Sequence, residues 1–94
     1  MGIDQVIGTN RGRVLQLAER FGADDVRIFG SVARKEATLA SDIDILVSPL
    51  GRQYDPISLA LALKKLLGRE VDLVSEESLH WLVQPQVIAE AVPL

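Results

Sequence analysis

The sequence of 94 residues contains no cysteine and only one histidine, His80. The lack of cysteine excludes disulfide frameworks, zinc ribbons and thiol nucleophiles, so a metal site could use only carboxylates or that histidine. The same absence agrees with a reducing compartment, and we expect a cytoplasmic protein. No apolar run approaches the ~20 residues that a membrane span requires, and the N-terminal segment has no secretory signal pattern. We therefore expect neither export nor a membrane partner.

Basic residues are not in excess either. Ten Lys and Arg stand against 13 Asp and Glu, which gives a net charge of −3. We expect no strong nucleic-acid binding, because neutralising phosphates requires a basic surface. The apolar fraction of 48% is sufficient for a folded core and argues against disorder. We expect residues 1–94 to form a single domain.

Hydrophobic periodicity and turn residues predict an α/β protein in which helices pack on a small mixed β-sheet. The expected elements are helices over 10–21 and 56–67 and strands over 25–30, 42–48 and 70–75. Asp55 followed by Pro56 is typical of a helix start, and Gly68 of a helix end. Residues 76–92 predict one or two short helices interrupted at Pro85.

The pair Gly30-Ser31 follows the first expected strand. A glycine at that point allows a close backbone approach, and a helical turn after it would direct free N–H groups and the Ser31 hydroxyl at one place. Such a place attracts phosphate. A Gly-Ser pair is common, however, and when it is taken alone an ordinary turn is the better explanation.

Asp42 and Asp44 flank Ile43 in the second expected strand. Side chains at i and i+2 project from the same face of a strand, so the two carboxylates lie close together and repel. A cation between them relieves that repulsion, and oxygen ligands without sulfur or imidazole suit Mg²⁺. The alternatives are a solvated strand face, or Asp42 acting as a turn residue.

Asp72 is a third acid inside an apolar strand, between Val71 and Leu73. Aspartate is depleted in strands, so its presence there asks for a reason. If this strand pairs beside residues 42–48, three carboxylates face a phosphate-binding turn. That is the arrangement required for two-metal phosphoryl chemistry.

Gly30-Ser31, ten residues and then Asp42-Ile43-Asp44 resembles the signature of the DNA polymerase beta-like nucleotidyltransferases. Gly, Ser, Asp and Asp at these fixed offsets are expected by chance once in ~10⁵ start positions. Residues 14–94 are similar to the minimal nucleotidyltransferases, small prokaryotic domains without a substrate-binding domain. The similar stretches are FGSVAR, SDIDILV, LGREVDLV and EAVPL.

The resemblance implies the nucleotidyltransferase fold and transfer of a nucleoside monophosphate, AMP from ATP, to a hydroxyl. In that reading Asp42 and Asp44 hold two Mg²⁺ ions, while Asp72 binds the catalytic metal and helps to deprotonate the acceptor. Gly30 and Ser31 hold the β- and γ-phosphates. Arg34, at a commonly basic position, neutralises the triphosphate.

The chain departs from the family pattern at two positions. Many relatives have a basic residue at the position of Val32 and glycine at that of Lys35. The first departure removes a charge that favours nucleotide binding, and Lys35 is the residue that could replace it.

Other residues have simpler readings. A packing or surface role is expected for His80, and packing on the sheet for Trp81. Tyr54 reads as an exposed loop residue in preference to a base-stacking one. Lys64 and Lys65 read as a solvated helix face.

The family resemblance also implies a partner. With all 94 residues assigned to the catalytic layer, we expect the acceptor hydroxyl on another molecule. Minimal nucleotidyltransferases often pair with HEPN-domain toxins, whose tyrosine they adenylylate as antitoxins. The alternative is a non-catalytic module that neutralises its partner by contact through the apolar tail VIAEAVPL. A transferase for small molecules ranks lowest because it needs an added acceptor domain, and a homo-oligomer remains compatible with the sequence.

Overall fold

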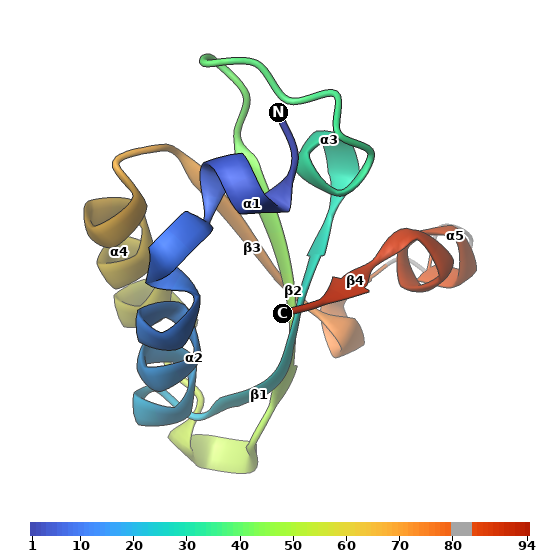
Figure 1. Cartoon of the computed structure of the whole chain (residues 1–94). Helices are drawn as coiled ribbons and strands as arrows, with labels where there is room; N and C mark the ends of the chain where they lie inside the picture. The colour runs from blue at the N-terminus through green and yellow to red at the C-terminus, as the bar shows by residue number, and fades with distance from the viewer. Residues whose placement is uncertain (80–83) are drawn as a thin grey trace.

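The computed structural model describes residues 1–79 and 84–94, so the interpretations of His80 and Trp81 fall outside the described residues. Four strands form one sheet, and helices lie on both of its faces (Figure 1). The elements in chain order are α1 (Ile3–Val6), η1 (Gly8–Asn10), α2 (Arg11–Arg20), β1 (Ala23–Phe29), α3 (Gly30–Ala33), β2 (Ile43–Pro49), η2 (Gly51–Gln53), α4 (Pro56–Leu67), β3 (Val71–Ser75), η3 (Glu76–Ser78), α5 (Gln84–Glu90) and β4 (Val92–Pro93).

The strand order is β3-β2-β1-β4. Strands β2 and β3 run parallel, connected by α4, whereas β1 is antiparallel to both β2 and β4. The sheet is therefore mixed, as the sequence predicts. Helices α2 and α4 cover one of its faces, and α5 lies on the other side (Figure 1).

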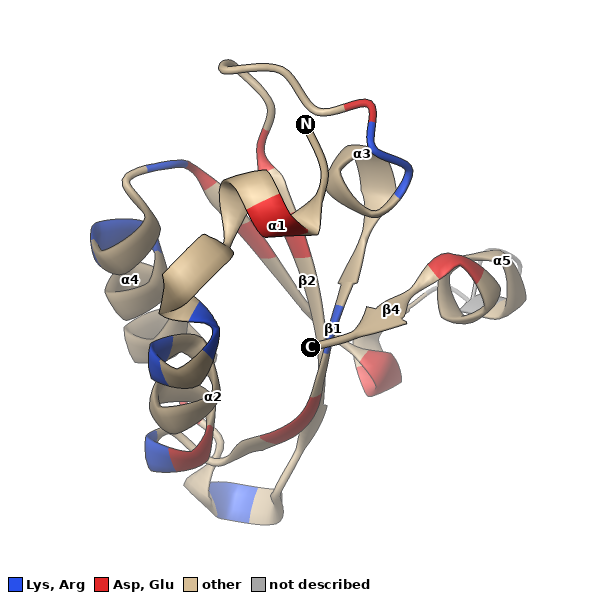
Figure 2. Ribbon diagram, in the orientation of Figure 1, with Lys and Arg blue, Asp and Glu red and all other residues tan. Residues whose placement is uncertain are grey.

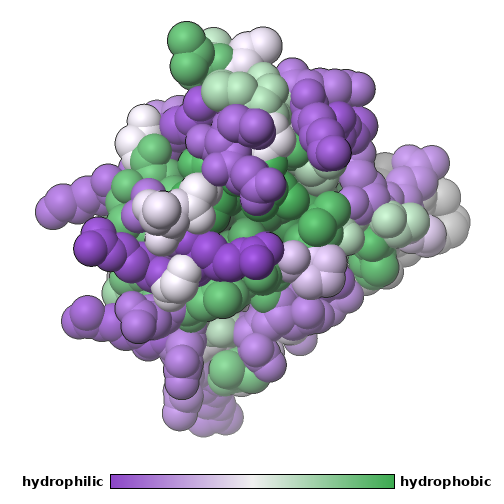
Figure 3. Space-filling model, in the orientation of Figure 1, coloured by the Kyte–Doolittle hydropathy of each residue, from purple (hydrophilic) through white to green (hydrophobic). Residues whose placement is uncertain are grey.

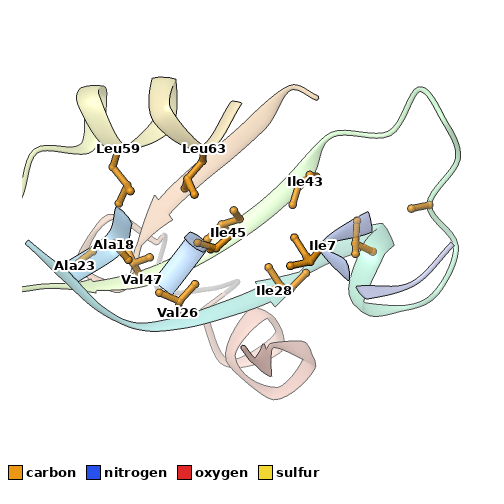
Figure 4. Packing of buried hydrophobic residues seen from close by; sticks show 13 residues of the cluster. Ile7, Ala18, Ala23, Val26, Ile28, Ile43, Ile45, Val47, Leu59 and Leu63 are labelled. Carbon is orange, nitrogen blue, oxygen red and sulfur yellow. The ribbon is translucent and has the colours of Figure 1, made fainter. Parts of the chain in front are cut away.

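The hydrophobic core lies between the sheet and helices α2 and α4 (Figure 4). Alternate residues of β2 point into it and are completely buried, and Leu59 and Leu63 of α4 meet them. The alternating β2 residues are Ile43, Ile45 and Val47. This period of two leaves the intervening positions, including Asp44, on the opposite face of the sheet.

Helix α4 has the boundaries that its capping residues predict. The Asp55 carboxylate accepts a hydrogen bond from the Ser58 amide at 3.1 Å, and Pro56 is the first helical residue. Gly68 ends the helix in the left-handed conformation with φ of 66°. Lys64 and Lys65 are exposed, as expected, and Lys64 pairs with Glu70 at 2.8 Å.

The C-terminal part of the chain differs from the prediction. Pro85 does not interrupt a helix but is the second residue of α5, where a proline costs no intrahelical hydrogen bond. Val92–Pro93 forms the edge strand β4, which two residues with one proline do not reveal by alternation. The short helix α1 was likewise not expected.

Tyr54 corrects another expectation. The residue is partly buried and packs against the core, although the loop around it reads as exposed. Burial raises the pKa of its hydroxyl above the usual value.

The surface seen in Figure 3 mixes hydrophilic and hydrophobic side chains. Within the described ranges no helix has the length and apolar character needed to cross a membrane.

Candidate active site

Asp44 and Asp72 meet on the sheet face opposite α2 and α4, and Asp42 lies just before β2, outside the sheet. Asp44 of β2 is paired in register with Asp72 of β3, and Asp42 lies two residues before Asp44. Figure 2 shows acidic positions on both neighbouring strands. The parallel pairing of β2 with β3 thus brings Asp44 and Asp72 together, and Asp42 is near enough for its charge to act on Asp44. Asp42 and Asp72 are exposed, and Asp44 is half-buried.

Asp44 has the most perturbed electrostatics of the three. Its pKa is raised to about 6, first because burial disfavours the charged form, then because of the negative charges of Asp72 and Asp42. The positive charge of Arg34 acts in the opposite direction. The ionised form of Asp44 therefore lacks compensating positive charge, which a divalent cation would supply.

The donor set fits such a cation. In residues 1–79 and 84–94, no group of three His, Asp or Glu side chains is arranged so that it could hold a metal ion. Mg²⁺ does not need one, because it is typically held by one or two carboxylates together with substrate phosphates and water. Asp44, Asp72 and Asp42 offer oxygen ligands only, which suits this hard cation.

Gly30 is held directly beside the aspartates. It starts α3 with φ of 70°, and a Cβ atom at this position would overlap the carboxylate of Asp44. Both its backbone conformation and the close approach of Asp44 therefore require glycine. Ser31 follows in the helical turn that the sequence predicts, and its carbonyl accepts the Glu36 amide at 2.8 Å.

Arg34 directly follows α3 and is bound by two carboxylates. Its Nε donates to Glu36 at 3.1 Å and its Nη1 to Glu90 at 2.6 Å. Half of the Arg34 side chain remains exposed. The other oxygen of Glu90 accepts the backbone N–H of Gly30 at 3.1 Å.

Glu90 is a residue that the sequence reasoning missed. The hydrogen bond from Arg34 is the main cause that lowers the pKa of Glu90, with the Gly30 amide and the charge of Arg34 adding to it. The only signal was an acid inside the apolar segment 87–94, whose partner could not be known before β4 was placed against β1.

The two departures from the family pattern have structural explanations. Val32 is completely buried in the core, so this position does not present a side chain to solvent. Lys35 has φ of 64°, a conformation in which glycine is unstrained, and its Cγ would contact a Cβ placed on Gly2 at 3.2 Å. The preference for glycine at the position of Lys35 thus has a conformational reason.

The geometry agrees with comparisons to known proteins. A family model described as the nucleotidyltransferase domain matches residues 13–94. The protein adenylyltransferase MntA of Thermococcus cleftensis is 40% identical over 79 residues, covering 82% of this chain and 80% of that protein. A protein of Methanocaldococcus jannaschii, provisionally named a protein adenylyltransferase, is 37% identical over 82 residues, covering 85% and 88%.

Solved structures agree with these relatives. A structure provisionally described as a minimal nucleotidyltransferase has a TM-score of 0.86 and 43% identity, covering 100% of this chain and 97% of that one. A toxin–antitoxin structure with AMP-PNP has a TM-score of 0.74 and 26% identity, covering 89% and 71%. The prediction made from Gly30-Ser31 and the aspartates is confirmed at the level of fold and family. The chain belongs to the nucleotidyltransferase domain family.

Proposed function

We propose that this protein transfers AMP from ATP to a hydroxyl of a partner protein, with Mg²⁺ held by Asp42, Asp44 and Asp72. The observation that carries this proposal is the pairing of Asp44 with Asp72 in register while Asp44 packs against Gly30. Metal-binding carboxylates and a phosphate-binding turn thereby share one face of the sheet. The names of the MntA relative and of the structure with AMP-PNP support the choice of adenylyl transfer.

Each residue has a distinct part in this reaction. The acceptor oxygen bonds to the α-phosphorus of ATP, the bond to the β-phosphate oxygen breaks, and pyrophosphate leaves. Asp72 accepts the proton of the acceptor in this proposal, and its exposed carboxylate supports that role. Gly30, Ser31 and Arg34 bind the departing phosphates. The metal, when bound, polarises the phosphate and neutralises the charge that develops on it.

The acceptor that we propose is a tyrosine hydroxyl on a HEPN-type toxin, with this chain as its antitoxin. The toxin–antitoxin structure that the chain resembles supports a toxin partner. The carboxylates lie on an open face, since Asp42 and Asp72 are exposed. They do not line the hollow of about 370 Å³ that lies next to Gly2 and Lys35. A large acceptor can therefore approach them directly.

The test is label transfer from [α-³²P]ATP to the product of the neighbouring gene in the presence of Mg²⁺. We expect Asp44→Asn to lower transfer by on the order of 10³-fold, because Mg²⁺ loses a central carboxylate ligand and no longer neutralises the phosphates. Asp24→Asn makes the same change on an exposed position of β1 and should leave transfer unchanged. Equal transfer by wild type and Asp44→Asn would contradict the proposal.

A second candidate is neutralisation of the partner by contact alone. Ile88 and Val92 of the C-terminal segment are 39% and 38% exposed, which favours a docking role for this part of the chain. The double variant Asp42→Asn, Asp44→Asn separates the two candidates. Full suppression of partner toxicity by that variant would establish the contact mechanism, and lost suppression with retained binding would establish catalysis.

A further inference from the structure

Glu90 connects two groups that the proposed reaction uses. One carboxylate oxygen accepts the Gly30 amide at 3.1 Å, and the other accepts Arg34 Nη1 at 2.6 Å. The Glu90 side chain is 27% exposed, so this carboxylate is much less hydrated than an ordinary surface glutamate. Charge-assisted hydrogen bonds of this kind are about twice as strong as neutral ones.

The edge strand β4 places Glu90 at this point. Ile28 of β1 pairs with Val92, and Arg27 pairs with Pro93, in antiparallel register. Gly30 lies two residues after Ile28, at the start of α3, and Glu90 lies two residues before Val92, at the end of α5. The amide of Leu94 also donates to the Val26 carbonyl at 2.9 Å, which extends the backbone attachment. Backbone pairing therefore sets Glu90 against the start of α3.

Arg34 can bind Glu90 and still bind a phosphate. The guanidinium has five N–H donors in a rigid plane. Nε donates to Glu36 and Nη1 to Glu90, while Nη2 has no hydrogen-bond partner within residues 1–79 and 84–94. The two carboxylates thus fix the plane of the guanidinium and leave one of its edges for another anion.

We propose that Glu90 is a positioning residue for nucleotide binding, which rests on the proposed function. It holds the start of α3 through Gly30 and the orientation of Arg34 through one carboxylate. Gly30 lies between two carboxylates, with Glu90 on its N–H and Asp44 against its Cα. Glu90 therefore connects the turn at Gly30 to the C-terminal edge strand. On its other side, the same turn packs against Asp44 of β2.

The chain offers a matched set of variants to test this role. Glu90→Gln keeps the size and the acceptor for Gly30 but removes the negative charge that pairs with Arg34. Glu90→Ala removes both contacts. Glu36→Gln, the control, removes the other negative charge that pairs with the same guanidinium and does not affect the contact with Gly30.

We expect Glu90→Gln to raise the Kd for Mg²⁺–AMP-PNP and the KM for ATP roughly tenfold while kcat stays within about twofold, since a charged hydrogen bond is lost. Glu36→Gln should change Kd by less than about twofold, because its carboxylate is more exposed. In Glu90→Ala, the Gly30 amide should exchange faster with solvent. Restored slow exchange in Glu90→Gln would show that the acceptor oxygen is responsible.

Unchanged or tighter nucleotide binding by Glu90→Gln would overturn the inference, because it would show that Glu90 competes with the phosphates for Arg34. The same holds if Glu36→Gln has an equal effect. Wild-type protein that binds AMP-PNP without transferring AMP would contradict the proposed reaction but leave the role of Glu90 in binding to be judged by these Kd values. Wild-type protein that binds no nucleotide would overturn both.

Discussion

The two faces of strand β2 differ in almost every property although their residues alternate along seven positions. Ile43, Ile45 and Val47 are completely buried against α2 and α4. Asp44 points the other way, toward Asp72 and Gly30. The face of Ile43, Ile45 and Val47 lowers the free energy of the fold by apolar burial alone. The other face also buries Leu46 completely, but around Asp44 it accumulates like charge that opposes folding until a cation binds. Stability and function are therefore separable within one strand.

Replacing a buried residue of β2 should give the largest change in stability. Ile45→Ala leaves a cavity in the core and should lower the free energy of unfolding by about 2–5 kcal/mol. Because Ile45 points away from the aspartates, AMP transfer per folded molecule should be little changed at low temperature. Urea denaturation and the transfer assay, each compared with Asp44→Asn, measure the two effects. A large loss of stability in Asp44→Asn would contradict the separation of the faces.

The acidic face should respond to changes in its glycine turn. Gly30→Ala places a Cβ against the Asp44 carboxylate in a backbone conformation with φ of 70°, so we expect a loss of about 2 kcal/mol together with weaker nucleotide binding. Gly12→Ala is the control, since Gly12 lies in α2 with nothing near its Cα. It should leave nucleotide binding unchanged and stabilise the helix slightly. Equal effects of the two changes on binding would contradict the role of Gly30.

Asp44 also gives the acidic face a pH dependence opposite to that of ordinary carboxylates. Its pKa is about 6 in the folded chain against 3.8 when unperturbed, so the folded state binds more protons between these values. Without Mg²⁺, stability should therefore fall as pH rises from about 4 to 6. Solvent screening of this half-exposed group limits the loss to on the order of 1 kcal/mol.

The measurement is urea denaturation in EDTA between pH 4 and 7 for wild type and Asp44→Asn. The difference between the two proteins isolates Asp44 from Glu76, Glu90 and Asp55, whose pKa values are lowered. The difference should appear as pH rises through this range and should shrink when Mg²⁺ is added at pH 7. A difference that does not vary with pH would contradict the assigned cause.

Much of this architecture could be predicted from the sequence, because its signals are local. The caps of α4 and the alternation in β2 follow from neighbouring residues, as does the pairing of Asp42 with Asp44 on one face. The contact of Glu90 with Gly30, 60 positions apart, could not be predicted, because it depends on the pairing of a two-residue strand with β1. Spacing along the chain carries no information about such a pair.

The smallest effect concerns Lys35, which lies just beyond α3. Its φ of 64° strains any side chain with a Cβ, so Lys35→Gly should stabilise the protein by up to about 1 kcal/mol. The greater freedom of glycine in the unfolded chain reduces this gain. Lys65→Gly, in the last turn of α4, makes the same replacement in a helical conformation and should instead cost up to about 1 kcal/mol.

The nucleotide affinity of Lys35→Gly tests whether Lys35 also contributes to nucleotide binding. If Lys35 serves only to end the turn, the Kd for Mg²⁺–AMP-PNP should stay within about twofold of wild type while thermal stability rises. A Kd that weakens tenfold would instead show that this lysine supplies the positive charge absent at Val32. Because Val32 is completely buried in the core, the positive charge would then come from Lys35, three positions further along the chain.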